Sequence, residues 1–131
     1  MSIHSMKITQ AFTFEAAHRL PHVPMTHRCY RMHGHSYRVE LRLKGEVDPH
    51  TGFVVDFFDV EAAFAPLLAQ LDHHCLNEVT GLENPTAENI ALWIWERARP
   101  ALPQLAAVSV YETPHCWAEY EGTDAETSHR G

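Results

Sequence analysis

Two segments of the chain alternate between apolar and polar residues, which is typical of half-buried β-strands. In residues 6–19 the apolar face ends at His18, and in residues 33–44 the apolar face begins with His33 and His35 and continues through Tyr37 to Leu43. Side chains two residues apart in a strand point to the same side. The pattern therefore places three histidines on apolar strand faces.

The middle of the chain instead shows helical spacing of its apolar residues. A helix is predicted over about 57–71 from the spacing of Val60, Phe64, Leu67, Leu68 and Leu71. Asp56 or Asp59 can cap its start. Pro66 lies within this helix. Because proline has no amide hydrogen to donate to the preceding turn, this residue favours a kink in the helix. A second helix is predicted from a cap at Thr86 through Arg97, ending before residues 100–103.

Two further extended pieces, 108–112 and 115–120, follow the second helix, and residues 45–52 have the composition of a turn. The order strand, strand, helix, helix, strand, strand predicts an α+β fold, a four-stranded antiparallel sheet with both helices packed on one face. We expect a single domain over residues 1–121 and a disordered polar tail over 122–131.

Composition narrows the classes of partner. The 131 residues suit one domain, and the formal charge of −7, with eleven histidines counted as neutral, argues against nucleic acid and membrane surfaces. A small molecule or a metal ion is the expected partner, and a domain of this size is expected to form a homo-oligomer.

The start resembles no signal peptide, so a cytoplasmic location is expected. Three cysteines do not suit a disulfide framework.

The spacing of His33 and His35 is suited to a metal ion. Residues i and i+2 of a strand have Cα atoms about 6.6 Å apart on one side, close enough for both imidazoles to reach one ion. His18 is the natural third ligand if the two strands pair, and three histidines leave a fourth position open, as catalytic zinc requires. The alternatives are hydrogen-bonded core imidazoles or a structural zinc site that includes cysteine, although Cys75 and Cys116 lack the short paired spacing of such sites.

Candidate acid and base groups flank these histidines. Cys29 lies four residues before His33 in a loop with Arg28 and Arg31, where nearby cations favour a thiolate. Its alternative is an ordinary small loop residue. Asp72 directly precedes His73, and a carboxylate can orient and support an imidazole, although adjacent residues are more often separate surface groups.

Glu112 follows Val108 and Val110 on the apolar face of its strand, where a carboxylate needs a partner. An amidine-like edge of a heterocycle would satisfy both oxygens, and an internal salt bridge to arginine or lysine is the alternative. Thr86 and Glu88 are interpreted first as helix-capping groups and second as ligand contacts.

Taken together, these residues resemble the 6-pyruvoyl-tetrahydropterin and 6-carboxytetrahydropterin synthase family over about residues 8–121. The motifs that carry the resemblance are Phe14-Glu15-Ala16-Ala17-His18-Arg19-Leu20, Cys29-x-x-x-His33-Gly34-His35, Gly45-Glu46-Val47-Asp48-Pro49-x-Thr51-Gly52, Leu71-Asp72-His73-His74, Asn84-Pro85-Thr86-Ala87-Glu88 and Tyr111-Glu112-Thr113. The short interval from Cys29 to His33 resembles the branch that forms 6-carboxytetrahydropterin for queuosine biosynthesis. Pyruvoyl-forming members tend to have a longer insert there.

The resemblance implies a T-fold and a lyase that converts 7,8-dihydroneopterin triphosphate to 6-carboxy-5,6,7,8-tetrahydropterin, with release of acetaldehyde and triphosphate. It implies that His18, His33 and His35 bind Zn²⁺, that Cys29 is the general base, and that Asp72 and His73 transfer protons. Glu112 would anchor the pterin, with Thr86 and Glu88 near it. Family members commonly form hexamers from two trimers, with active sites between subunits. The alternatives are the pyruvoyl-forming synthase and a zinc- or pterin-binding protein without turnover.

Overall fold

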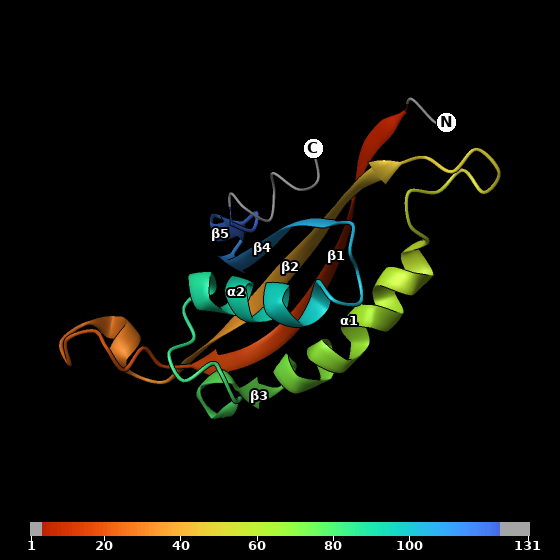
Figure 1. Cartoon of the computed structure of the whole chain (residues 1–131). Coiled ribbons are helices and arrows are strands. Elements are labelled where there is room, and N and C mark those ends of the chain that lie inside the picture. The colour runs from red at the N-terminus through yellow and green to blue at the C-terminus, as the bar shows by residue number, and fades with distance from the viewer. Residues whose placement is uncertain (1–3, 124–131) are drawn as a thin grey trace.

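The computed structural model describes residues 4–123 and contains a single sheet with two α-helices (Figure 1). The elements in chain order are β1 (Ser5–His18), a 3-10 turn η1 (Arg28–Tyr30), β2 (His33–Glu46), α1 (Phe57–Leu71), β3 (His74–Cys75), a second 3-10 turn η2 (Leu76–Glu78), α2 (Ala87–Ala98), β4 (Leu105–Thr113) and β5 (Cys116–Tyr120). Of the predicted tail, only residues 122 and 123 are described, and 124–131 lie outside the described residues.

The predicted α+β class is confirmed, but the number of strands is wrong. The sheet has five strands in the order β3-β1-β2-β4-β5. The additional strand, β3, pairs in parallel with β1 through Ala16 and Ala17, whereas the other pairs are antiparallel. Because β3 has two residues, it is too short to show an alternating pattern, and sequence periodicity could not reveal it.

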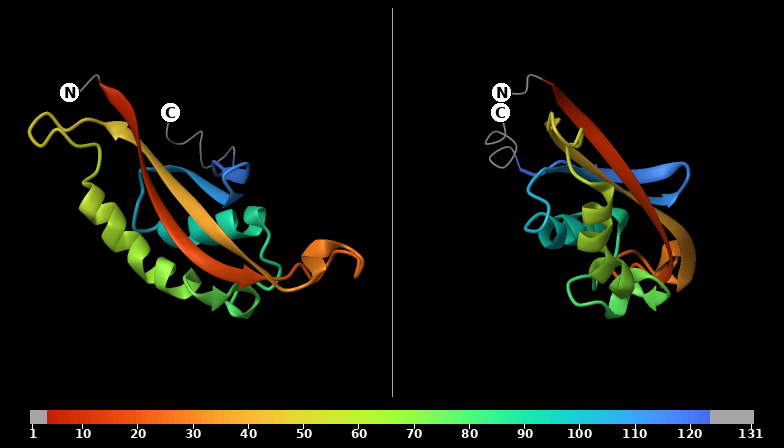
Figure 2. Two further views of the ribbon diagram at one scale, coloured as in Figure 1. Left: turned by 180° about the vertical axis from the view of Figure 1, so that it is seen from behind. Right: turned by 90° about the vertical axis from the view of Figure 1, so that its right-hand side faces the viewer.

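Both helices cover one face of the sheet, as expected (Figures 1 and 2). The core between them is built from the inward residues of β1, β2 and β4 and from the apolar sides of α1 and α2. Val60, Phe64, Leu67 and Leu71 of α1 are buried, as their helical spacing predicts. The opposite face of the sheet is polar and carries Arg38, Arg42 and Glu119.

The ends of the helices follow from capping. Asp56, rather than Asp59, is the N-cap of α1 and accepts from the amide of Phe58, and Thr86 caps α2 by accepting from Asn89. Pro66 does not end α1, which continues to Leu71. Because Pro66 has no amide hydrogen, the carbonyl of Ala62 has no helical partner. Both residues lie on the exposed side of the helix, so water can satisfy that carbonyl.

The register of β1 and β2 determines where the site forms. The two strands pair antiparallel along their full length, with His18 opposite His33 and Ala16 opposite His35. The end of β1 and the beginning of β2 therefore lie side by side, connected by the segment 19–32 that extends from this end of the sheet (Figure 1). No helix in the described range 4–123 is long and apolar enough to cross a membrane.

Candidate metal centre and active site

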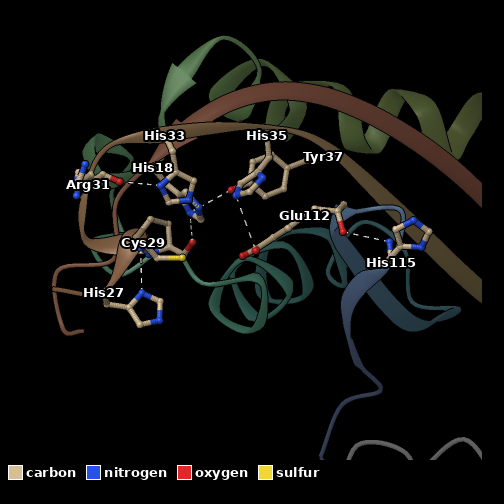
Figure 3. A network of polar contacts seen from close by, with 11 residues as sticks. His18, His27, Cys29, Arg31, His33, His35, Tyr37, Glu112 and His115 are labelled. Carbon is tan, nitrogen blue, oxygen red and sulfur yellow. Dashed lines mark hydrogen bonds and ion pairs between the residues drawn. The ribbon is translucent and has the colours of Figure 1, made fainter. Parts of the chain in front are cut away.

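Three histidine rings meet where β1 ends and β2 begins (Figure 3). The potential ligand atoms of His18, His33 and His35 all lie within 4.8 Å of one another. His18 is buried at 1% exposure, and the other two rings are partly buried. The ring centroids of the three pairs lie 4.6 to 5.1 Å apart, with steep interplanar angles, so the rings surround a common point rather than stack.

Hydrogen bonds orient two of these rings toward that point. The Nδ1 atom of His18 donates to the carbonyl of Pro85 at 2.8 Å, and Nδ1 of His33 donates to the carbonyl of Arg31 at 2.7 Å. A carbonyl can only accept, so in the neutral rings both hydrogens lie on Nδ1 and both Nε2 atoms carry lone pairs. Such outer contacts are the usual way in which proteins orient metal-binding histidines.

The resulting arrangement fits a cation. The Nε2 atoms of His18 and His33 lie 3.0 Å apart with their lone pairs facing each other, and Nε2 of His35 is buried without a hydrogen-bond partner. Two nitrogens bound to one tetrahedral zinc ion lie about 3.3 Å apart, given Zn–N distances of about 2.05 Å. The donors present therefore suit a divalent ion that takes imidazole nitrogen.

The environment also keeps the imidazoles neutral, the form that binds metal. Burial lowers the pKa of His18, and the hydrogen bond to Pro85 opposes this change only in part. Burial also lowers the pKa of His35, although the Glu112 carboxylate opposes it. These two rings are therefore available as ligands at neutral pH.

A hollow of about 450 Å³ opens beside the triad and contains Cys29, Glu112 and Arg28, together with His33 and His35. Figure 3 shows the side chains of Cys29 and Glu112 on the same side of the histidine cluster. Cys29 lies in η1, whose N-cap His27 accepts from the backbone amide of Cys29 at 3.0 Å. The structure thus brings together the predicted metal ligands, the predicted base and the predicted pterin anchor.

Glu112 faces the triad instead of a cation from the chain. Its Oε2 lies 3.9 Å from Nε2 of His35, and its side chain is 28% exposed. The arginine or lysine salt bridge considered from the sequence is not among the ion pairs found for the described residues. Its carboxylate remains partly exposed toward the hollow, where a ligand can reach it.

Asp72 and His73 do form a pair, but His73 lines a separate hollow. Oδ1 of Asp72 lies 3.0 Å from Nδ1 of His73, and the His73 side chain is 76% exposed. The hydrogen bond from the Glu15 amide, followed by that from His73, holds the pKa of Asp72 below its usual range. The hollow beside His73 has a volume of about 570 Å³, and of its lining residues it shares His35 with the hollow beside Cys29.

The backbone at His73 has a conformation that few residues adopt. His73 has a φ of 60°, in the left-handed region that residues other than glycine rarely adopt. The amide of His73 donates to the carbonyl of Glu15, and that of Asp72 to the carbonyl of Leu68, so contacts on both sides hold the turn. Strain of this kind, about 1 kcal/mol or more, is often found at functional sites.

Thr86 and Glu88 were predicted as further ligand contacts, and of these two only Glu88 lies beside Glu112, the predicted pterin anchor. Glu88 is exposed and lines a hollow of about 190 Å³ with Glu112 and Cys116. Thr86 caps α2 and lines neither this hollow nor the one beside Cys29.

Sequence reasoning missed three groups at the site. Pro85 contributes its carbonyl, Cys116 lines the hollow beside Cys29, and the buried Tyr37 places its hydroxyl 3.1 Å from Nδ1 of His18. Tyr37 lies on the same strand face as His33 and His35, so the alternating pattern carried a signal for it. Nothing in the sequence pattern indicated the Pro85 carbonyl, because a backbone contact leaves no mark on residue identity.

Fold and site together define an α+β protein with a three-histidine centre suited to a metal ion, beside a pocket that holds a thiol and a carboxylate. Comparison with known proteins gives the family. Residues 7–123 match the family described as 6-pyruvoyl tetrahydropterin synthase. The chain therefore belongs to this family of pterin-processing enzymes, and the resemblance inferred from its motifs is confirmed.

Individual relatives carry three different names. A 6-carboxy-5,6,7,8-tetrahydropterin synthase from Synechocystis is 41% identical over 119 residues, covering 86% of this chain and 91% of the relative. A dihydroneopterin monophosphate aldolase from Pyrococcus furiosus is 34% identical and covers 88% and 96%. The structure of 6-pyruvoyl tetrahydropterin synthase from Caenorhabditis elegans superposes with a TM-score of 0.86 at 26% identity, covering 94% and 99%.

Proposed function

We propose that this protein is a zinc-dependent 6-carboxy-5,6,7,8-tetrahydropterin synthase. It would convert 7,8-dihydroneopterin triphosphate to 6-carboxytetrahydropterin and release acetaldehyde and triphosphate, in queuosine biosynthesis. One observation carries the proposal: three imidazole nitrogens converge on one point, and two of these rings, His33 and His35, line a hollow together with Cys29 and Glu112. The name of the Synechocystis relative supports the choice of product.

His18, His33 and His35 would hold the zinc ion. Zinc bound there would supply a Lewis acid that polarises the hydroxyls of the substrate side chain. The Glu112 carboxylate would accept from the amino-pyrimidine edge of the pterin and so orient the ring, because two carboxylate oxygens match two parallel donors. Glu88 is the neighbouring candidate contact, and Thr86 would act through the start of α2.

Cys29 would remove a proton from the substrate side chain, and the Asp72–His73 pair would move a proton on its other side. Since Nδ1 of His73 lies against the Asp72 carboxylate, Nε2 of His73 is left to exchange the proton. The low pKa of Asp72 keeps its carboxylate ionised and able to stabilise a protonated His73.

We further propose that the protein assembles as a hexamer built from trimers and that His73 of one chain completes the site of another. The Cys29 hollow and the His73 hollow are separate within one chain, as described above. Both outer edges of the sheet also favour assembly: β3 covers β1 only at Ala16 and Ala17, and β5 forms the opposite edge. Free strand edges are surfaces on which another chain can pair. The cytoplasmic location expected from the sequence stays a prediction.

The decisive experiment is incubation of the purified protein with zinc and dihydroneopterin triphosphate, followed by identification of products by mass. Acetaldehyde and 6-carboxytetrahydropterin are expected. Loss of triphosphate with retention of the three-carbon side chain would instead identify a pyruvoyl-forming synthase, the activity named for the Caenorhabditis elegans structure. Binding of zinc and pterin without any product would leave the third alternative, a binding protein.

A further inference from the structure

We propose that Tyr37 is a positioning residue of the metal centre, whose hydroxyl holds the His18 imidazole with Nε2 directed at the ion. This inference rests on the proposed metal binding by the triad and adds a residue that the sequence motifs did not assign. Tyr37 follows His35 by two residues on β2, so its ring lies on the same face of the sheet as the triad (Figure 3).

The Tyr37 ring is fixed from several sides. The side chain is fully buried at 0% exposure, and its ring stacks on Phe14 with centroids 4.8 Å apart and an interplanar angle of 9°. It also meets the rings of His18 and His35 edge to face, at 5.9 and 5.5 Å. A ring held in this way places its hydroxyl at one point, 3.1 Å from Nδ1 of His18.

Whether Nδ1 of His18 carries a hydrogen determines whether the Tyr37 hydroxyl accepts from it or donates to it. Nδ1 must carry its hydrogen, because the Pro85 carbonyl 2.8 Å away can only accept. The Tyr37 oxygen is therefore a second acceptor for the same hydrogen, and the ring is held from two directions. Rotation of the imidazole, or transfer of its hydrogen to Nε2, would turn a lone pair toward the carbonyl and block the metal position.

The hydroxyl is expected to affect metal affinity more than folding. A bound cation withdraws electron density from an imidazole and makes its Nδ1–H a stronger donor, so acceptors at Nδ1 stabilise the metal-bound state more than the metal-free state.

The test compares zinc dissociation constants of the wild type and Tyr37→Phe by competition with a chromophoric chelator. Phenylalanine keeps the ring that packs on Phe14 and removes only the hydroxyl. We expect zinc binding to weaken about tenfold, the lower end of the range for outer-shell contacts. Tyr111→Phe removes a hydroxyl from a ring that stacks on Trp117 and lies with Arg38 and Glu40 on the opposite face of the sheet, and its dissociation constant should match the wild type.

The outcomes separate this inference from the proposal on which it rests. Equal dissociation constants for the wild type and Tyr37→Phe would overturn the role of Tyr37 alone. If the wild type bound no stoichiometric zinc, or if His33→Ala bound it as tightly as the wild type, the proposed metal centre would fail as well. Should Tyr37→Phe not fold, NMR of the zinc-loaded wild type decides: a through-space contact between the Nδ1 hydrogen of His18 and the ring hydrogens beside the Tyr37 hydroxyl is expected, and its absence would refute the inference.

Discussion

At the scale of single residues, the triad cannot be explained as three hydrogen-bonded core imidazoles. In a core, each ring nitrogen finds a partner, because an unsatisfied buried polar atom costs about 1 to 3 kcal/mol. Nε2 of His35 has no hydrogen-bond partner, and the Nε2 atoms of His18 and His33 face each other with lone pairs. A shared cation removes both costs, which is why we prefer a metal site.

Cys29 can be tested separately from the metal ligands. Because its thiol is not one of the three converging nitrogens, Cys29→Ala should retain about one zinc per chain while product formation falls about 10²- to 10⁴-fold, the usual contribution of a general base. Metal content by elemental analysis and product mass are measured on the same sample. Cys29→Ser nearly keeps the size of the side chain, but a hydroxyl does not ionise near neutral pH as a thiol can, so this variant should be equally impaired. Full activity in the serine variant would remove Cys29 from the mechanism.

At the scale of elements, the sequence predicted the strands that carry the triad because their apolar residues alternate over many positions. It predicted both helices and the Thr86 cap for similar reasons. It did not predict β3, which depends on a left-handed turn at His73 and on contacts with Glu15, 57 or more residues away in the chain. Local patterns carry no record of such long-range pairing.

The start of α2 connects helix stability to the metal centre, because Thr86 caps the helix and the preceding Pro85 accepts from His18. Thr86→Ala should lower the free energy of unfolding by about 1 kcal/mol through loss of the cap. It should also weaken zinc binding, since the Pro85 carbonyl is no longer held by an ordered first turn. Urea denaturation and chelator competition measure the two effects. Thr86→Ser retains the capping oxygen and should restore both; an alanine variant with unchanged stability would contradict the argument.

The polar face of the sheet predicts an acid-dependent contribution to stability. Glu119 on β5 accepts from Arg42 on β2 at 2.7 Å and from Ser109 on β4 at 2.9 Å, and these bonds, Arg42 first, lower its pKa. A carboxylate with a lowered pKa in the folded state stabilises the protein above the pKa of the unfolded chain, near 4.3, and loses that effect as pH falls through the folded value.

Glu119→Gln should therefore be less stable than the wild type above about pH 5, by no more than about 1 kcal/mol because the pair is partly exposed. The difference should shrink as pH falls toward about 3, where both chains carry a neutral group. Urea unfolding at a series of pH values measures it. A difference that stayed constant over this range would mean that Glu119 acts through packing and not through its charge.

At the scale of the whole molecule, two of the predicted catalytic residues, Cys29 and His73, line different hollows of one chain. The sequence could name Cys29, Asp72 and His73, but it could not say whether one chain brings them together, since that depends on the relation between chains. Within the described chain, Cys29 lines the hollow of the triad and His73 lines another. A site shared between subunits would reconcile both observations with a single reaction.

Subunit mixing tests this arrangement. Cys29→Ala and His73→Ala should each be nearly inactive alone, but after joint refolding or co-expression some sites would receive Cys29 from one chain and His73 from the other. If the two variants assort at random, about a quarter of all sites contain both an intact Cys29 and an intact His73, so about a quarter of wild-type activity should return. Mixing Cys29→Ala with the double variant carrying both substitutions should restore nothing. If the first mixture stays as inactive as its parents although mixed oligomers form, Cys29 and His73 belong to the same chain or to no common site.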